Sequence, residues 1–233
     1  MLVGYLIIYL NFLFIMNPKN IFSVLPNYKP SIGVMGSASG YLMRNPKAVS
    51  AAVELGKAIA KNNASLVNGA CPGLPDKAAE GCKLAGGETL GVSPAISLCS
   101  HMGKYKSPVD HYDRFIFTGM GLMMRDIVNI RTSDAVVILP GGTGTLNEFT
   151  VAYDEGKPIG VLTGYDGCAD HIKEILEFCH REVTDRMVFS SDPNELVEKL
   201  MEKLHEVNTS CNLDDYLVGE DGEVTKTEEQ FEK

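Results

Sequence analysis

Short apolar runs alternate with longer segments of helical periodicity from Ser31 onward. Short runs rich in Val and Ile predict buried strands, and apolar residues spaced three or four apart predict helices. The predicted strands are 31–36, 64–69, 87–94, 114–119, 134–140, 158–164 and 186–190. The predicted helices are 48–62, 75–85, 120–133, a segment from the GGTGT turn through Ala152, 170–181 and 192–206.

This alternation with short connections predicts an α/β fold, namely a Rossmann-like, doubly wound parallel sheet with helices on both faces. Ligands of such sheets bind beyond the carboxyl ends of the strands, where the strand order reverses. Three glycine-rich turns, GSASG, TGMG and PGGTGT, follow strands here, and we expect them to meet at one crevice. The irregular segment 96–113 is expected to border that crevice, with its histidines, including His101, at the surface.

The two ends of the chain differ from this body. Residues 1–30 begin with the apolar stretch MLVGYLIIYLNFLFIM, which is shorter than the ~20 residues that a membrane-spanning helix needs. Three interpretations remain open: a membrane-associated leader, an element that packs on the core, or a start placed ahead of the true start at Met16, which we favour. Residues 208–233 carry eight acidic residues against two lysines, which predicts a disordered acidic tail. The nucleotide-binding domain is therefore expected to span 31–207.

Charge and cysteine usage narrow the partners. The formal net charge of -9 argues against a nucleic-acid partner, including single-stranded DNA. The six cysteines form no CxxC pair. The cluster Cys168, His171, Cys179 and His180 admits a metal site, but free cysteines are commonly small buried apolar groups. We expect reduced thiols, no metal, no cofactor, no stable membrane insertion and a cytoplasmic location.

The PGGTGT turn carries the clearest chemistry. It joins a fully apolar run to a predicted helix, and its glycines let backbone N–H groups approach a ligand. A helix N-terminus binds anions through free N–H groups and the helix dipole. No GK[ST] follows, so this is no Walker loop, and GSASG lacks the GxGxxG spacing of dinucleotide-binding proteins. The turn is therefore predicted to bind the phosphate group of a ligand.

The stretch PGGTGTLNE resembles PGGxGTxxE, the signature of the LONELY GUY family of nucleotide phosphoribohydrolases, which are often mislabelled lysine decarboxylases. Family members carry an arginine at a fixed distance before the motif glutamate. Arg125 stands 23 residues before Glu148, and the similarity extends over GVMGSASG, LVNGACPGLPDKAAEGCKLAGG and KPIGVLTG. The chain resembles a prokaryote-type branch of this superfamily.

The resemblance implies a Rossmann-like fold, a homodimer, and cleavage of the bond between base and ribose in AMP or a modified purine nucleotide. It implies Arg125 and Glu148 as the catalytic pair. The phosphate or nucleotide contacts expected with them are Ser37, Gly141, Gly142, Thr143, Gly144 and Thr145. The alternative is a carrier or sensor that binds a nucleotide without turnover.

Three departures from the cytokinin-activating members bear on the substrate. Those members carry an arginine–lysine pair where this chain has Arg125–Asp126, and two adjacent acids where it has Asn147–Glu148. Their second-strand turn is all glycine, whereas this one reads GACPG. The catalytic pair is intact, so these changes are expected to alter which nucleotide is recognised.

In the mechanism that we expect, Glu148 stabilises an oxocarbenium-like state, orients the attacking water, or does both. Arg125 fixes either Glu148 or the ribose through charge-assisted hydrogen bonds. A plainer interpretation of Glu148, an acid in the first turn of a helix that complements the dipole, remains open at this point.

Overall fold

The computed structural model describes residues 27–210. Within these, Lys29–Leu204 form one compact unit, which contains all seven described strands and the candidate site. The predicted leader and the acidic tail lie largely outside the described residues. Among the described residues, no helix combines the length and the apolar character that crossing a membrane requires.

Seven parallel strands form a single sheet in the order β4-β3-β2-β1-β5-β6-β7, which confirms the predicted doubly wound architecture. From β1 the chain first builds outward to β4 and then returns to place β5 on the other side of β1, so the strand order reverses between β1 and β5. The strands are β1 (Ser31–Met35), β2 (Ser65–Asn68), β3 (Thr89–Ser93), β4 (Arg114–Phe117), β5 (Ala135–Ile138), β6 (Ile159–Leu162) and β7 (Met187–Ser190).

The described part of the chain contains seven α-helices and two 3-10 turns, most of them within a few residues of their predicted positions. They are η1 (Tyr41–Arg44), α3 (Pro46–Lys61), α4 (Leu74–Leu84), α5 (Leu98–Gly103), α6 (Gly121–Thr132), α7 (Thr143–Asp154), η2 (Cys168–His171), α8 (Ile172–Phe178) and α9 (Pro193–Ser210). Two differences stand out. The segment predicted as irregular contains the short helix α5, whose first turn is capped by Ser97. The helix predicted over 170–181 is divided into η2 and α8.

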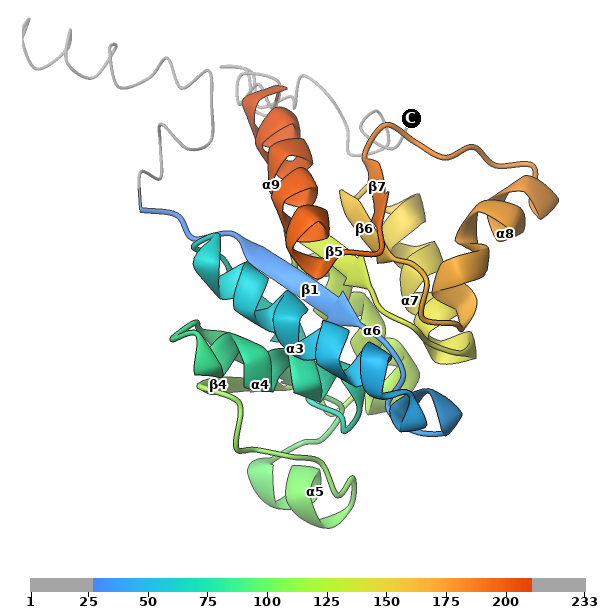
Figure 1. Ribbon diagram of the computed structural model, residues 1–233. Helices are drawn as coiled ribbons and strands as arrows, with labels where there is room; N and C mark the ends of the chain where they lie inside the picture. The colour runs from blue at the N-terminus through green and yellow to red at the C-terminus, as the bar shows by residue number, and fades with distance from the viewer. Residues whose placement is uncertain (1–26, 211–233) are drawn as a thin grey trace, which may run out of the picture. The chain divides into compact units, whose positions relative to one another are not determined.

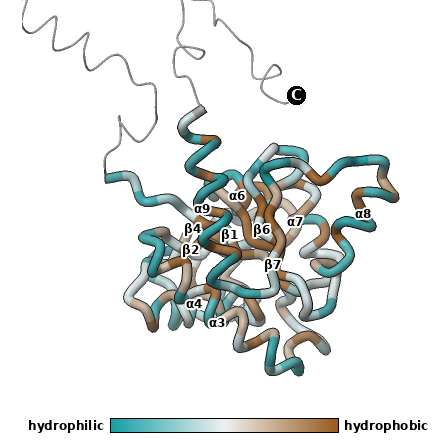
Figure 2. The backbone as a smooth tube through the Cα atoms, turned by 45° about the horizontal axis from the view of Figure 1, so that its top comes forward, coloured by the Kyte–Doolittle hydropathy of each residue, from teal (hydrophilic) through white to brown (hydrophobic). Residues whose placement is uncertain are grey.

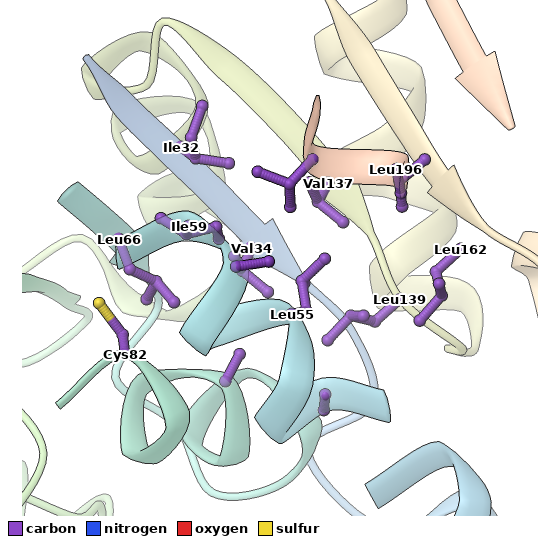
Figure 3. Close-up of a cluster of buried hydrophobic side chains, with 14 of the residues drawn as sticks. Ile32, Val34, Leu55, Ile59, Leu66, Cys82, Val137, Leu139, Leu162 and Leu196 are labelled. Carbon is purple, nitrogen blue, oxygen red and sulfur yellow. The ribbon is translucent and has the colours of Figure 1, made fainter. Parts of the chain in front are cut away.

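Helices cover both faces of the sheet, with a separate apolar cluster beneath each set. Alternate residues of one strand face opposite sides, so Val137 of β5 joins the cluster under α3, α4 and α9, whereas Val136 and Ile138 join the cluster under α6, α7 and α8. Figure 1 shows α3 and α9 on the near face of the sheet and α6 and α7 on the far face. Figure 3 shows side chains of the first cluster, including Ile32 and Leu55, converging between sheet and helices.

The helices α3 and α4 lie very close together because each contributes a glycine to their contact. A Cβ atom at Gly56 would collide with the carbonyl oxygen of Ala78, and one at Gly81 would collide with that of Val53. Asn45 caps α3, its side-chain oxygen accepting from the N–H groups of Lys47 and Ala48. The hydropathy colouring of Figure 2 shows the resulting distribution, with brown apolar strands inside and teal positions on the helices around them.

Candidate functional site

Three loops meet where the strand order reverses, at the carboxyl ends of β1, β2 and β5. The N–H of Ser37, in the loop after β1, donates to the carbonyl of Pro140 after β5 at 3.0 Å. The carbonyl of Ser37 accepts from the N–H of Leu74, at the start of α4, at 2.9 Å. The turns after the first, second and fifth strands are thereby tied together, and this is the position at which doubly wound sheets bind ligands.

The helix α7 begins at this junction with an open N-terminus. Its first helical hydrogen bond runs from the N–H of Leu146 to the carbonyl of Gly142, and no side chain caps it. The N–H groups of Thr143, Gly144 and Thr145 precede that bond, so they are among the donors that a helix leaves without partners in its own backbone. A helix of 12 residues with such donors attracts an anion.

A cavity of about 340 Å³ opens in front of this N-terminus. Its wall combines the β1 loop, the β2 turn and the starts of α6 and α7. The lining residues are Val34, Gly36, Ser37, Ala38, Ser39, Gly69, Cys71, Pro75, Leu122, Met123, Arg125, Asp126, Gly142, Thr143, Gly144, Thr145 and Glu148.

Arg125 reaches the cavity from the first turns of α6 and is only 5% exposed. Its Nη2 donates to the Sγ of Cys71 at 3.4 Å, and its Nε lies 3.7 Å from Oδ1 of Asp126. That Nε is buried and has no hydrogen-bond partner within residues 27–210. The guanidinium lies against Gly69, where a Cβ atom would overlap it. The small residue at the end of β2 therefore makes room for the arginine.

Glu148 lies on α7, one turn beyond the anion-binding donors, and is 9% exposed. No hydrogen bond to its carboxylate is found among the described residues, and it forms no ion pair with Arg125 within 4.0 Å. Burial raises the pKa of Glu148 to about 8, with a further rise from Asp126 and an opposing effect from Arg125. A buried carboxyl group without a partner is costly for folding, and such groups concentrate at functional sites.

The helix starts at Thr143, so Glu148 is its sixth residue and belongs to the second turn. The predicted placement in the first turn is therefore wrong. Interaction with the helix dipole decays within the first turn, so it does not explain an acid at this position. A role of Glu148 in ligand chemistry is therefore favoured over a role in complementing the helix dipole.

Two further ionisable side chains, those of Asp126 and Cys71, line the cavity. Asp126 is 6% exposed, and burial raises its pKa, against the attraction of Arg125 and a 3.5 Å hydrogen bond from Nδ2 of Asn147. Burial also raises the pKa of the Cys71 thiol, with Arg125 acting in the opposite direction. The thiol is therefore protonated at neutral pH, and the site holds one guanidinium and two carboxyl groups.

The cavity brings together most of the residues that the sequence singled out. Ser37, Arg125, Gly142, Thr143, Gly144, Thr145 and Glu148 all line it. Gly141 lies behind the wall instead, where a Cβ atom would overlap the side chain of Thr145 and where its carbonyl accepts from the N–H of Cys168 at 2.8 Å. Its predicted role as a direct ligand contact is thus the least supported of the set.

The segment 96–113 contributes no residue to this cavity, contrary to the prediction that it borders the site. His101 is also not at the surface but fully buried. Its Nε2 donates to the carbonyl of Pro108 at 3.0 Å, and its Nδ1 lies 2.8 Å from the hydroxyl of Ser93. Both ring nitrogens of His101 are therefore engaged in hydrogen bonds, which connect the segment 96–113 to β3.

Sequence reasoning noticed Cys71 and Asp126 only as departures from a family pattern and did not assign them to the site. Both follow from topology, because Cys71 lies in the turn after β2 and Asp126 is the neighbour of Arg125 in α6. The cluster of Cys168, His171, Cys179 and His180 in the sequence does not form a set of metal ligands in the structure. Nowhere in residues 27–210 do three or more His, Cys, Asp or Glu side chains come together as metal ligands could.

Comparison with known proteins finds sequence relatives of this chain. The model of the SLOG cluster4 family matches residues 29–197. A rice protein named as a probable cytokinin riboside 5'-monophosphate phosphoribohydrolase is 33% identical over an alignment of 169 residues, which covers 65% of this chain and 70% of the rice protein. The cytokinin riboside 5'-monophosphate phosphoribohydrolase of Mycobacterium tuberculosis is 36% identical over 110 residues, which cover 45% of this chain and 54% of that enzyme.

Solved structures share the fold. The molybdenum cofactor carrier protein of Chlamydomonas reinhardtii superposes with a TM-score of 0.61 at 28% identity, covering 76% of this chain and 99% of that one. The molybdenum cofactor binding protein of Rippkaea orientalis gives 0.60 at 27% identity, covering 76% and 98%. DNA processing protein A of Streptococcus pneumoniae, at 13% identity and a TM-score of 0.54, shares the fold alone. The chain therefore belongs to the SLOG cluster4 family of LONELY GUY-like proteins.

Proposed function

We propose that this protein is a nucleoside 5'-monophosphate phosphoribohydrolase that cleaves the bond between base and ribose of AMP or a modified purine nucleotide. One observation carries the proposal: α7 presents an open N-terminus and, one turn later, a buried carboxyl group without a partner to the same cavity. An anion site next to a reactive acid matches a substrate with a phosphate at one end and a scissile bond beyond it.

The phosphate would lie on the N–H groups at Thr143–Thr145, with the hydroxyls of Thr143 and Ser37 beside it. This anchoring supplies binding energy away from the reacting bond and positions the ribose. Cleavage passes through an oxocarbenium-like state. An ionised Glu148 stabilises this state by its charge, orients the water that attacks it, or does both. With a pKa of about 8, the same group is also available in its neutral form, which can donate a proton to the departing base.

Arg125 would act on the ribose rather than on Glu148. The two side chains form no ion pair, and the guanidinium is held between Gly69, Cys71 and Asp126. From this position its role is to keep a positive charge at the cavity wall and to order the sugar through charge-assisted hydrogen bonds.

The test is to incubate the purified full-length protein with a panel of nucleoside 5'-monophosphates and to measure free base and ribose 5-phosphate. We expect release from a purine nucleotide, and a loss of about a hundredfold or more in Glu148→Gln with nucleotide affinity retained. Turnover retained in Glu148→Gln would contradict the role of Glu148, and a complete absence of release would contradict the enzymatic proposal.

The alternative function is binding without turnover, as in a carrier or sensor of a phosphorylated ligand. Two observations favour it: the molybdenum cofactor carrier of Chlamydomonas is matched over 99% of its length, and Asp126 and Cys71 depart from the cytokinin-activating pattern. Tight nucleotide binding by calorimetry without release of base would support this alternative.

We further propose that the protein is a cytoplasmic homodimer without a nucleic-acid partner. Exposed apolar side chains cluster at the start of α6, next to the cavity, where a second copy would cover them. The net charge of -9 argues against association with a phosphate backbone.

A further inference from the structure

We propose that Asp126 is a specificity-determining residue that accepts a hydrogen bond from the 2'-hydroxyl of the ribose, so that the site selects ribonucleotides over 2'-deoxyribonucleotides. The inference deepens the proposed function and rests on its assignment of a nucleoside monophosphate to this cavity.

The first argument is the incomplete bonding of the Asp126 carboxylate. It lines the cavity and is 6% exposed, and two side-chain donors lie near it within the described residues. Both are distant: Nε of Arg125 at 3.7 Å and Nδ2 of Asn147 at 3.5 Å. An ionised carboxylate can accept about four hydrogen bonds, and a buried one is normally well bonded. Oxygen lone pairs that face a cavity without close donors are positioned to receive donors from a ligand.

The second argument is the position of Asp126 relative to the phosphate site. Its partner Asn147 lies four residues beyond Thr143 on α7, which is about 6 Å along the helix axis. In a nucleoside 5'-monophosphate only an ester oxygen and one methylene separate the phosphorus from the sugar ring. A phosphate bound at the N-terminus of α7 therefore brings the ribose, and not the base, to the level of Asp126.

The third argument is the position of the 2'-hydroxyl among the hydroxyl groups of the ribose. Glu148 neighbours Asn147 on α7 and is assigned to the reacting carbon of the sugar. The 2'-hydroxyl is attached next to that carbon, so it is the donor that comes nearest to a second carboxylate beside Glu148. Burial is the larger cause of the raised pKa of Glu148, and repulsion from Asp126 adds to it, in agreement with the closeness of the two carboxylates. A hydroxyl hydrogen between them would relieve part of this repulsion.

An alternative role of Asp126 is only to neutralise the charge of Arg125. In that case removal of Asp126 would weaken all phosphorylated ligands or strengthen all of them, without discrimination between sugars. A ratio of affinities for two sugars separates these roles, because a general change in charge affects both ligands alike.

The experiment measures binding of ribose 5-phosphate and 2-deoxyribose 5-phosphate to the full-length protein by calorimetry. These probes carry no base, so turnover does not interfere. We expect the wild type to prefer ribose 5-phosphate by about tenfold or more, because the deoxy sugar leaves a buried carboxylate unpaired. Asp126→Ala should bring the ratio to about one, and Asp126→Asn, whose amide oxygen still accepts, should give an intermediate ratio.

Asp154→Asn, at the exposed far end of α7, is the matched control and should keep the wild-type ratio. Equal affinities for the two sugars in the wild type would overturn the inference without any variant, as would an unchanged ratio in a folded Asp126→Ala. Binding of neither sugar phosphate would overturn it as well. The nucleotide panel decides the hydrolase separately: a ribose preference without release of base would leave this inference standing and remove only the enzymatic proposal.

Discussion

At the scale of single residues, the site holds polar groups that the fold does not satisfy. Glu148 has no hydrogen-bond partner, and Nε of Arg125 is buried without one, both within residues 27–210. Groups of this kind reduce stability, and they persist where a ligand supplies the missing partners. The same residues that favour a functional site should therefore lower the stability of the protein, which gives a measurable consequence.

We predict that Glu148→Gln stabilises the protein, and more so at pH 9 than at pH 5. The folded state holds the Glu148 proton up to about pH 8, whereas an unfolded glutamate releases it near its ordinary pKa of 4.5. Stability from this group is therefore present below pH 4.5 and is lost as the pH rises towards 8. Glutamine carries no charge at either pH, so the gain should be about 2–4 kcal/mol at pH 9 and small at pH 5.

Urea unfolding of both proteins at the two pH values measures this gain. Glu177→Gln, an exposed carboxyl group on α8, is the control and should show a difference near zero at both. Equal differences for Glu148→Gln at pH 5 and pH 9 would show that burial does not hold its proton.

At the scale of elements, much of the fold was predictable and several local features were not. The apolar run at 134–140 predicts β5 because a central parallel strand is buried on both faces, and the PGGTGT turn predicts the start of α7. The helix α5 escaped prediction, since six residues are too few to show periodicity. The burial of His101 also escaped, because its partners Ser93 and Pro108 depend on the tertiary fold.

Some residues of the candidate site could likewise be predicted from the sequence, and others could not. Gly142 to Thr145 could be predicted to line the cavity, because a local strand–turn–helix pattern marks them. Arg125 could be predicted because its distance from Glu148 resembles that of the LONELY GUY family. Gly69 could not be assigned from the sequence. Its role is to admit the guanidinium of a residue on another element, and nothing near it in the chain indicates that contact.

The close packing of α3 on α4 is an element-scale property that can be tested. We predict that Gly56→Ala lowers the free energy of unfolding by about 1–3 kcal/mol, because the new methyl group meets the backbone oxygen of Ala78 and forces the helices apart. Helix propensity alone would favour alanine by about 1 kcal/mol, so the sign of the change decides between propensity and packing.

Gly103→Ala, where no atom lies near the added methyl group, is the control and should change stability by no more than about 0.5 kcal/mol. A stabilised Gly56→Ala would mean that the two helices can separate at little cost.

At the scale of the whole molecule, apolar surface gathers beside the site. We define the α6 patch as Met120, Leu122, Met123 and Met124, each about half exposed. Ile96, 78% exposed, lies against Gly119 and extends the patch towards α5. Leu122 and Met123 also line the cavity, so whatever covers the patch stands at the entrance to the site. Contiguous exposed apolar residues of this kind mark association surfaces.

We predict that this patch joins two copies of the chain. Light scattering after size exclusion should give the wild type twice the chain mass of 25.3 kDa, and Met124→Lys should shift it to the monomer, because a lysine ammonium in an apolar interface loses its hydration without a partner. Met124 does not line the cavity, so the variant leaves the site itself unchanged.

Phe178→Lys, at an equally apolar but isolated position of α8 that is 86% exposed, is the control and should keep the dimer mass. A monomeric wild type, or a dimer that survives Met124→Lys, would mean that the patch serves another occupant. If the variant becomes monomeric and also loses turnover, the second copy completes the entrance to the cavity, which explains why the apolar patch lies on the same helix as Arg125 and Asp126.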